Sequence, residues 1–187
     1  LPAVAGLGMA TALAGGVTAA LQWQAKRVLA ASTSAQYGLM FVAVGAGSTA
    51  AAGAQLVTHA VFKSLLFLCA GVAIHAAGSG DLGDMRLGRV VPRVARLSLV
   101  GAAALAAIPP LGGAWSKQEI GAAAAHSSTW LLVGVLVAGA LSVTYALRYH
   151  LLAFGRDPTD HNRIGHRRDA QPTTLERWSL GVLAAIT

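Results

Sequence analysis

Long apolar runs separated by short charged segments are the feature that most limits what this chain can fold into. Residues 1–21 carry no charge, and about 20 such residues are what an α-helix needs to cross ~30 Å of hydrocarbon. Of all residues, 55% are hydrophobic and 11% charged, whereas soluble domains carry about 25% charged residues. The first run lacks the basic start of a signal peptide. The sequence therefore predicts a membrane protein.

The apolar segments predict helices, because no stretch alternates with the period of two that a membrane strand shows. They cover residues 1–22, 28–45, 50–77, 94–108 with a continuation to about 125, and 128–154; a sixth begins near Leu175. We expect an all-α membrane protein with about five transmembrane helices and part of a sixth. Residues 1–154 would form a five-helix transmembrane repeat, 155–174 a basic cytoplasmic loop and 175–187 the start of a further helix. Since the chain has no initiating Met and stops within an apolar run, we expect a piece of a longer polypeptide.

The basic residues indicate the orientation in the membrane. If every segment crosses once, the first, third and fifth connections lie on one side. These connections and their flanks hold twelve of the fourteen basic residues: Lys26, Arg27, Arg86, Arg89, Arg93, Arg96, Arg148, Arg156, Arg163, Arg167, Arg168 and Arg177. The positive-inside rule then makes the loops at 23–27, 78–93 and 155–174 cytoplasmic. The net charge of +7 reflects this orientation, and we expect no nucleic acid as a partner.

The remaining two basic residues, Lys63 and Lys117, fall at membrane depth, where a lysine costs ~2.5–3.5 kcal/mol on insertion scales. Counting back from Lys63 in fours gives His59 and Gln55, so the three side chains share one helix face. Lys and His can each take up and release a proton, which is what a proton relay requires. The alternative is that this polar stripe only ties helices together by hydrogen bonds.

The segment around Lys117 predicts a helix break, because Pro109-Pro110 and Gly112-Gly113 cannot continue a helix. Broken helices at membrane depth are tolerated where they face protein or a water-filled cavity. Ser116 and Glu119 have the spacing of a capping box, which would start the second half-helix. Glu119 is then either a cap or a further relay residue, and Lys117 either a relay residue or a lysine that reaches the outer interface.

Other polar residues are weaker candidates. Ser32, Thr33, Ser34 and Gln36 either face the polar stripe or pair helices, and His150 is either an interfacial residue or a proton entry or exit point. No zinc spacing, phosphate loop or nucleophile–base pair is present, and the single Cys69 excludes an internal disulfide. We therefore expect no catalytic residue, metal or cofactor.

Three runs of residues together resemble the proton-antiporter family. They are residues 26–36, from Lys26-Arg27 to Gln36; residues 58–68, from Thr58-His59 through Lys63; and residues 108–119, from Ile108-Pro109-Pro110 to Ser116-Lys117-Gln118-Glu119. Members of this family are antiporter-like subunits of respiratory complex I, above all its large subunit L or chain 5, and subunits of Mrp-type antiporters. The order and spacing of all three runs agree, so the resemblance covers essentially the whole chain.

The resemblance implies two inverted five-helix repeats, of which this chain would be the second. It implies that Lys63 and Lys117 are the axis lysines of a proton path, with His59 between them and Lys26 at the cytoplasmic end of a helix. The chain departs from the family pattern where Gln24 and Gln118 replace acids and Gln55 replaces a second histidine.

These observations together favour proton translocation through a polar axis formed by Lys63, Lys117, His59, Gln55 and Lys26, with Glu119 and His150 as further candidates. The chain would be an antiporter-like subunit of a complex I-related or Mrp-type assembly in the cell (inner) membrane, with other membrane subunits and the lipid bilayer as partners. The redox chemistry of an NADH:quinone oxidoreductase-like complex would lie in other chains. The alternatives are a non-conducting membrane scaffold and a Na⁺/H⁺ antiporter module.

Overall fold

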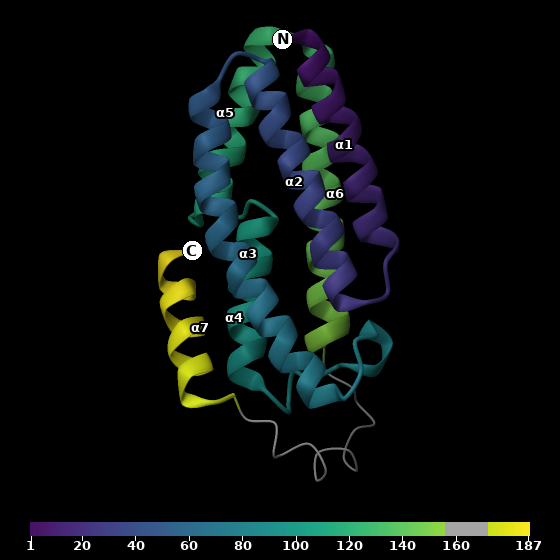
Figure 1. Ribbon diagram of the computed structural model, residues 1–187, viewed down its shortest axis with the longest axis vertical. Coiled ribbons are helices and arrows are strands. Elements are labelled where there is room, and N and C mark those ends of the chain that lie inside the picture. Colours follow the sequence, from purple (N-terminus) through teal and green to yellow (C-terminus); the bar gives the residue numbers. More distant parts are fainter. Residues whose placement is uncertain (156–171) are drawn as a thin grey trace.

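The computed structural model describes residues 1–155 and 172–187, which form a bundle of helices and contain no strand (Figure 1). The elements are α1 (Pro2–Leu21), α2 (Ala25–Gly45), α3 (Thr49–Ala77), the short 3₁₀ helix η1 (Leu82–Asp84), α4 (Pro92–Leu105), α5 (Gly112–Ser127), α6 (Thr129–Phe154) and α7 (Thr174–Ile186). The predicted all-α membrane fold with one broken helix is confirmed.

Within the described residues, four helices are long and apolar enough to cross a membrane, namely α1, α2, α3 and α6. The shorter helices α4, of 14 residues, and α5, of 16 residues, follow one another along the bundle (Figure 1). At 1.5 Å per residue each spans about half of a typical bilayer with its headgroups. The pair therefore makes one crossing, with its break near the middle of the bundle.

Apart from the break between α4 and α5, the connections lie at the two ends of the bundle (Figure 1). Residues 22–24 and 78–91 and the start of α7 lie at one end, which we call the basic end; residues 46–48 and residue 128 lie at the opposite end. Lys26 and Arg27 open α2, and Arg93 opens α4. Most of the predicted basic loop, residues 156–171, lies outside the described residues, and with it Arg156, Arg163, Arg167 and Arg168.

Small residues bring α1 and α2 into close contact along their length. Gly38 lies so near Ala12 that an added Cβ would collide with the Ala12 amide nitrogen, and one on Gly8 would be 2.7 Å from the amide nitrogen of Val42. Close backbone approach of this kind is how membrane helices pack where there is no hydrophobic driving force between them. The abundance of Gly and Ala thus has a packing function in this hairpin.

The break between α4 and α5 is held by backbone contacts on both sides. An added Cβ on Gly113 would collide with the Ala104 carbonyl oxygen, so only glycine fits this approach of α5 to α4. The Gly112 amide donates to the Thr187 carbonyl, just after α7, at 3.0 Å. A backbone donor that the break would leave unpaired at membrane depth is therefore paired by a neighbouring segment.

At the basic end, the α1–α2 connection is fixed to its neighbours. The Ala25 amide donates to the Gly80 carbonyl at 2.9 Å, and the Leu82 amide donates to the Trp23 carbonyl at 2.8 Å. Arg148 of α6 donates to the Gln22 carbonyl at 2.6 Å and lies over the Trp23 ring, 4.6 Å from its centroid. These contacts tie the α1–α2 and α3–α4 connections and α6 together at the end where the basic residues gather.

Candidate functional site: a buried polar row across the bundle

The polar stripe on α3 lies inside the bundle. Gln55, His59 and Lys63 are exposed by only 0%, 3% and 5%. The other faces of α3 carry apolar side chains that pack in the core or lie at the surface, such as Leu65 and Leu56. The spacing of four residues thus places the three polar side chains on one enclosed face, as the sequence predicts.

Lys63 bonds to α2. Its ammonium donates to the Leu29 carbonyl at 2.9 Å and also to the Ser32 hydroxyl. The Ser32 hydroxyl in turn donates to the same Leu29 carbonyl at 3.0 Å. The ammonium of Lys63 thus has two acceptors inside the bundle. One is a hydroxyl, and the other is a carbonyl that also accepts a hydrogen bond within its own helix. We call Lys63, Ser32 and the Leu29 carbonyl the lysine layer.

His59 lies one turn from Lys63 on the same face of α3. Its ring makes edge contacts with Tyr37 and Phe62, with centroid separations of 5.8 Å and 5.3 Å. The Nε2 atom is buried and has no hydrogen-bond partner among the described residues. The imidazole is thus positioned by aromatic packing, and one of its nitrogens is left free to bind a further group.

A second polar layer lies one turn farther along α3, and we call it the amide layer. The Gln55 amide nitrogen donates to the Gln36 side-chain oxygen at 2.8 Å, and the Ser116 hydroxyl donates to the Gln55 side-chain oxygen at 2.6 Å. The Gln36 amide nitrogen donates to the hydroxyls of Ser142, at 3.1 Å, and Tyr145, at 2.8 Å. Five buried side chains therefore join α2, α3, α5 and α6.

Lys117 lies beside the helix break. Its ammonium donates at 2.6 Å to the carbonyl of Leu105, the last residue of α4. The last carbonyls of a helix have no intrahelical partner and form the negative end of its dipole, so the break itself supplies the acceptor. Lys117 is partly buried and lines a cleft of about 430 Å³ between α5 and α6, together with Gln118, Ala106 and Val143.

We call the lysine layer, His59, the amide layer and Lys117 together the polar row. Within it, Lys63, His59 and Lys117 are close enough to influence one another. Both Lys63 and Lys117 interact electrostatically with His59, and Lys117 also interacts with Lys63. Two helices and the break thus bring together residues that are up to 58 positions apart in the sequence, such as His59 and Lys117. This clustering could not be deduced from helix periodicity alone.

The predicted capping box at Ser116 and Glu119 is wrong. Helix α5 begins four residues earlier, at Gly112, with Leu111 as its N-cap and no side-chain cap. Ser116 therefore lies inside the helix and uses its hydroxyl to bond Gln55. The physical reason is that the two glycines form the first turn of α5, because the approach to Ala104 requires a residue without a side chain.

The remaining candidates lie outside the row. Lys26 is exposed at the start of α2, and Gln118 and Glu119 are exposed on α5. His150 is partly buried near the basic end of α6, where its ring stacks on Phe154 at 5.7 Å. The structure thus brings Gln55, His59, Lys63 and Lys117 together and leaves these four apart.

Sequence reasoning missed two members of the amide layer, Ser142 and Tyr145. Both lie on α6, whose sequence is mainly apolar. Polar residues in such a helix can also lie at its surface, so their presence alone does not indicate a buried contact. Their spacing of three places them on one helix face, which is the available signal, but only the packing of α6 against α2 shows that this face meets Gln36.

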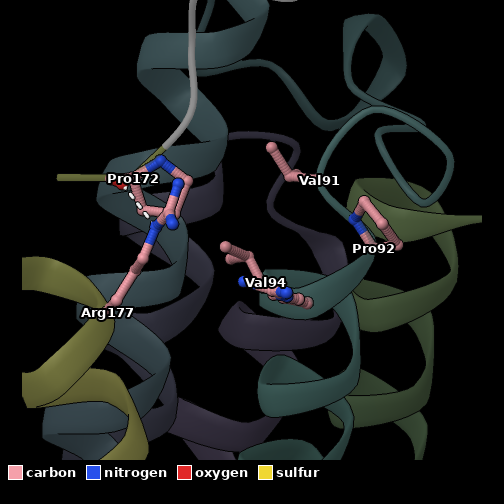
Figure 2. A pocket seen from close by; sticks show the side chains of 6 residues that line it. Val91, Pro92, Val94, Pro172 and Arg177 are labelled. Carbon is pink, nitrogen blue, oxygen red and sulfur yellow. Dashed lines mark hydrogen bonds between the residues drawn. The ribbon is translucent and has the colours of Figure 1, made fainter. Parts of the chain in front are cut away.

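A smaller cavity of about 100 Å³ lies at the basic end between α4 and α7 (Figure 2). Its wall includes Val91, Val94 and Arg177, and the Arg177 guanidinium donates to the Pro172 carbonyl at 2.9 Å (Figure 2). The cavity shares no lining residue with the buried polar row. The candidate site is therefore the row, which brings two lysines and a histidine from α3 and α5 within electrostatic reach of one another.

Comparison with known proteins agrees with this architecture. Residues 2–142 match the family described as "NADH:quinone oxidoreductase/Mrp antiporter, TM". The matched range contains α1 to α5 and the first half of α6, and so all residues of the polar row except Tyr145.

Two relatives illustrate the range of the family. The NADH-quinone oxidoreductase subunit L of Rickettsia felis is 37% identical over 183 residues, which is 96% of this chain and 28% of that protein. A protein of Rhizobium meliloti that is named as a probable K⁺/H⁺ antiporter component is 37% identical over 172 residues, covering 85% of this chain and 17% of that protein. The chain thus spans less than a third of the length of these relatives.

A solved structure has the same fold. A chain of the membrane-bound sulfane sulfur reductase, an archaeal respiratory membrane complex, superposes with a TM-score of 0.88 at 27% identity, covering 99% of this chain and 31% of that one. The match of the family model over most of the chain, the sequence identity to complex I and antiporter subunits, and this superposition agree. The chain belongs to the family of membrane subunits of NADH:quinone oxidoreductases and Mrp antiporters.

Proposed function

We propose that this chain forms part of a proton path across the membrane, in which Lys63, His59 and Lys117 exchange protons. The observation that carries the proposal is the placement of a buried lysine, a buried histidine and a partly buried lysine within electrostatic reach of one another inside an apolar bundle. Ionisable residues inside a membrane are costly and commonly mark proton or ion pathways. Gln55 takes part as a hydrogen-bonding member of the row, and Lys26 would lie on the path at the basic end of the bundle, outside the row.

The free Nε2 of His59 supports a relay through this residue. An imidazole can accept a proton on one nitrogen and release it from the other, so it passes a proton without turning round. His59 lies one turn from Lys63 on α3, and Lys117, beside the break, is within electrostatic reach of it. A water molecule bonded to the free Nε2 of His59 would connect the three groups.

Orientation and partners follow from the same proposal. The basic end would face the cytoplasm, by the positive-inside rule, and the membrane would be the cell (inner) membrane, as for the bacterial relatives. The chain would be the second five-helix repeat, residues 1–154, of a longer antiporter-like subunit, followed by the loop 155–174 and the further helix from 175. It would work with other membrane subunits that supply the energy for transport, and any redox chemistry would take place in them.

The test is proton flux through the full-length protein, purified with the subunits that copurify and reconstituted in liposomes. The double substitution Lys63→Ala and Lys117→Ala should abolish driven proton uptake while the assembly stays intact, as checked by size-exclusion chromatography. Lys26→Ala is the matched control, because this lysine is exposed at a helix end.

Undiminished flux in the double variant would contradict the relay and favour a scaffold role. A flux that depends on Na⁺, with the gradient of Na⁺ dissipated in parallel, would instead favour cation exchange. The exposed position of Glu119, the one acidic residue of α5, argues against a sodium site on that helix.

A further inference from the structure

The amide layer differs in chemistry from the rest of the polar row. A proton moves along a chain of hydrogen bonds only if each member can take a proton and release another. Hydroxyls, amines and imidazoles can do so, but a side-chain amide donates only from nitrogen and accepts only on oxygen. Gln55 donates to Gln36 at 2.8 Å, so the chain of hydrogen bonds contains two adjacent side-chain amides.

The hydrogen bonds of this layer all run in one direction. They lead from Ser116 to Gln55, from Gln55 to Gln36, and from Gln36 to Ser142 and Tyr145. Turning both amides round would reverse these bonds together and still leave two amides in the middle. The layer is also closed, because Gln36 and Gln55 are fully buried and Ser116, Ser142 and Tyr145 are exposed by 2% or less.

The layer lies between the titratable groups of α3, His59 and Lys63, and the end of the bundle opposite the basic end. On α3, His59 and Lys63 lie toward the basic end from Gln55, and on α2 Ser32 lies toward it from Gln36. Beyond the layer, residues 37–45 of α2, 49–54 of α3 and 129–141 of α6 contain no Asp, Glu, His, Lys or Arg. Of the four helices that the layer joins, only α5 carries such residues there, and Lys117 is the first of them.

We propose that the Gln36–Gln55 pair is a proton barrier that closes the direct path along α3 and confines proton exchange with the opposite end to the Lys117 side, along α5. This inference rests on the proposed proton path and assigns Gln55 a positioning role within it. The cleft between α5 and α6 that Lys117 lines provides the space for such an outlet. A barrier of this kind would keep protons from leaking through the bundle when no energy source drives transport.

The experiment measures passive proton leak down an imposed pH gradient in liposomes that contain the full-length protein with its copurifying subunits, without the substrate or counter-ion gradient that would drive transport. Gln55→His places a titratable group in the layer at similar size. It should raise the leak by at least about tenfold, which is below the 10²-fold or more that a positioned proton-transfer group typically contributes. Gln55→Met is the matched variant, since it removes the same hydrogen bonds without adding a titratable group, and its leak should stay at the level of the unmodified protein.

Equal leaks in the two variants, whether high or low, would overturn the barrier, because a purely structural role predicts no difference between them. Gln55→His combined with Lys117→Ala gives a second readout. The leak should persist, since the new path crosses the layer without Lys117; a leak that disappears would also overturn the inference. Failure of the proposed proton path would be detected in a different measurement, namely driven proton flux that is undiminished when Lys63 is replaced.

Discussion

The two intramembrane lysines are held in different ways. Lys63 is exposed by 5% and donates to a hydroxyl and to a carbonyl in the middle of a continuous helix. Lys117 is partly buried, lines a cleft of about 430 Å³, and donates to the last carbonyl of a helix that stops inside the membrane. The first site is enclosed by close packing, and the second depends on an interruption of the backbone.

This difference shows two ways to place an amine inside a bilayer. At Lys63 a hydroxyl and a carbonyl of α2 are the acceptors inside a closely packed layer, so the exact shape of the layer matters. At Lys117 the break supplies an acceptor from the backbone and leaves space around the ammonium. We therefore expect the two positions to respond differently to the same substitutions.

The largest effect is expected for arginine at position 63. A guanidinium is planar and larger than an ammonium, so Lys63→Arg should displace the packed lysine layer and lower driven proton uptake by about tenfold or more, because a misplacement of ~1 Å can cost about 10²-fold. Lys117→Arg should retain most of the uptake, since the cleft can accommodate the longer group. Equal losses in the two variants would show that enclosure does not distinguish the sites.

The break can be tested through its glycine. Gly113→Ala should lower the free energy of unfolding by about 1–3 kcal/mol, the usual cost of overpacking, because the new Cβ would meet the Ala104 carbonyl. Gly121→Ala on the same helix is the control, since an added Cβ there meets no atom within 4 Å. Thermal unfolding of the detergent-solubilised protein, followed by circular dichroism, would measure both. Equal stability of the two variants would contradict a tight approach of α5 to α4.

A smaller effect is expected for the hydroxyl of the lysine layer. Ser32→Ala removes one of the two acceptors of Lys63 and should cost about 0.6–1.7 kcal/mol, as interhelical hydrogen bonds in membranes do. Ser64→Ala is the control, because Ser64 is exposed and bonds only to the Ala60 carbonyl of its own helix. If Ser32→Ala and Ser64→Ala unfold at the same temperature, the hydroxyl does not help to hold Lys63.

The smallest effect is expected for Lys26→Ala. This lysine is exposed at the start of α2, outside both lysine sites, and makes no hydrogen bond or ion pair within the described ranges. Driven proton uptake should equal that of the unmodified protein when both are measured with the same fluorescent pH dye. A loss comparable to that of Lys63→Ala would extend the path to the basic end.

Much of this site could be predicted from sequence, because the membrane environment makes polar residues informative. The spacing of Gln55, His59 and Lys63 determines a shared helix face, and the cost of a buried charge predicts that this face points inward. A break near Pro109-Pro110 follows from the backbone of proline. None of these steps requires knowledge of the neighbouring helices.

The partners could not be predicted, because they depend on which helices lie side by side. Ser142 and Tyr145 meet Gln36 across more than 100 residues of sequence, and the Leu105 carbonyl is available to Lys117 only because α4 ends there. The start of α5 is predicted wrongly for a related reason. Two glycines in a row indicate a break, but here the contact with α4 makes them the first turn of a helix.

The close contact between α1 and α2 bears on how the bundle can move. Where two backbones are in contact through glycine and alanine, no long side chains lie between them that could change rotamer. The two helices are therefore expected to move as one rigid unit. A change of shape during transport is therefore expected elsewhere, at the seams where α2 meets α3 and α5 meets α6. The polar row and the cleft lie at those contacts. The α1–α2 hairpin would therefore stay fixed while the neighbouring helices move relative to it.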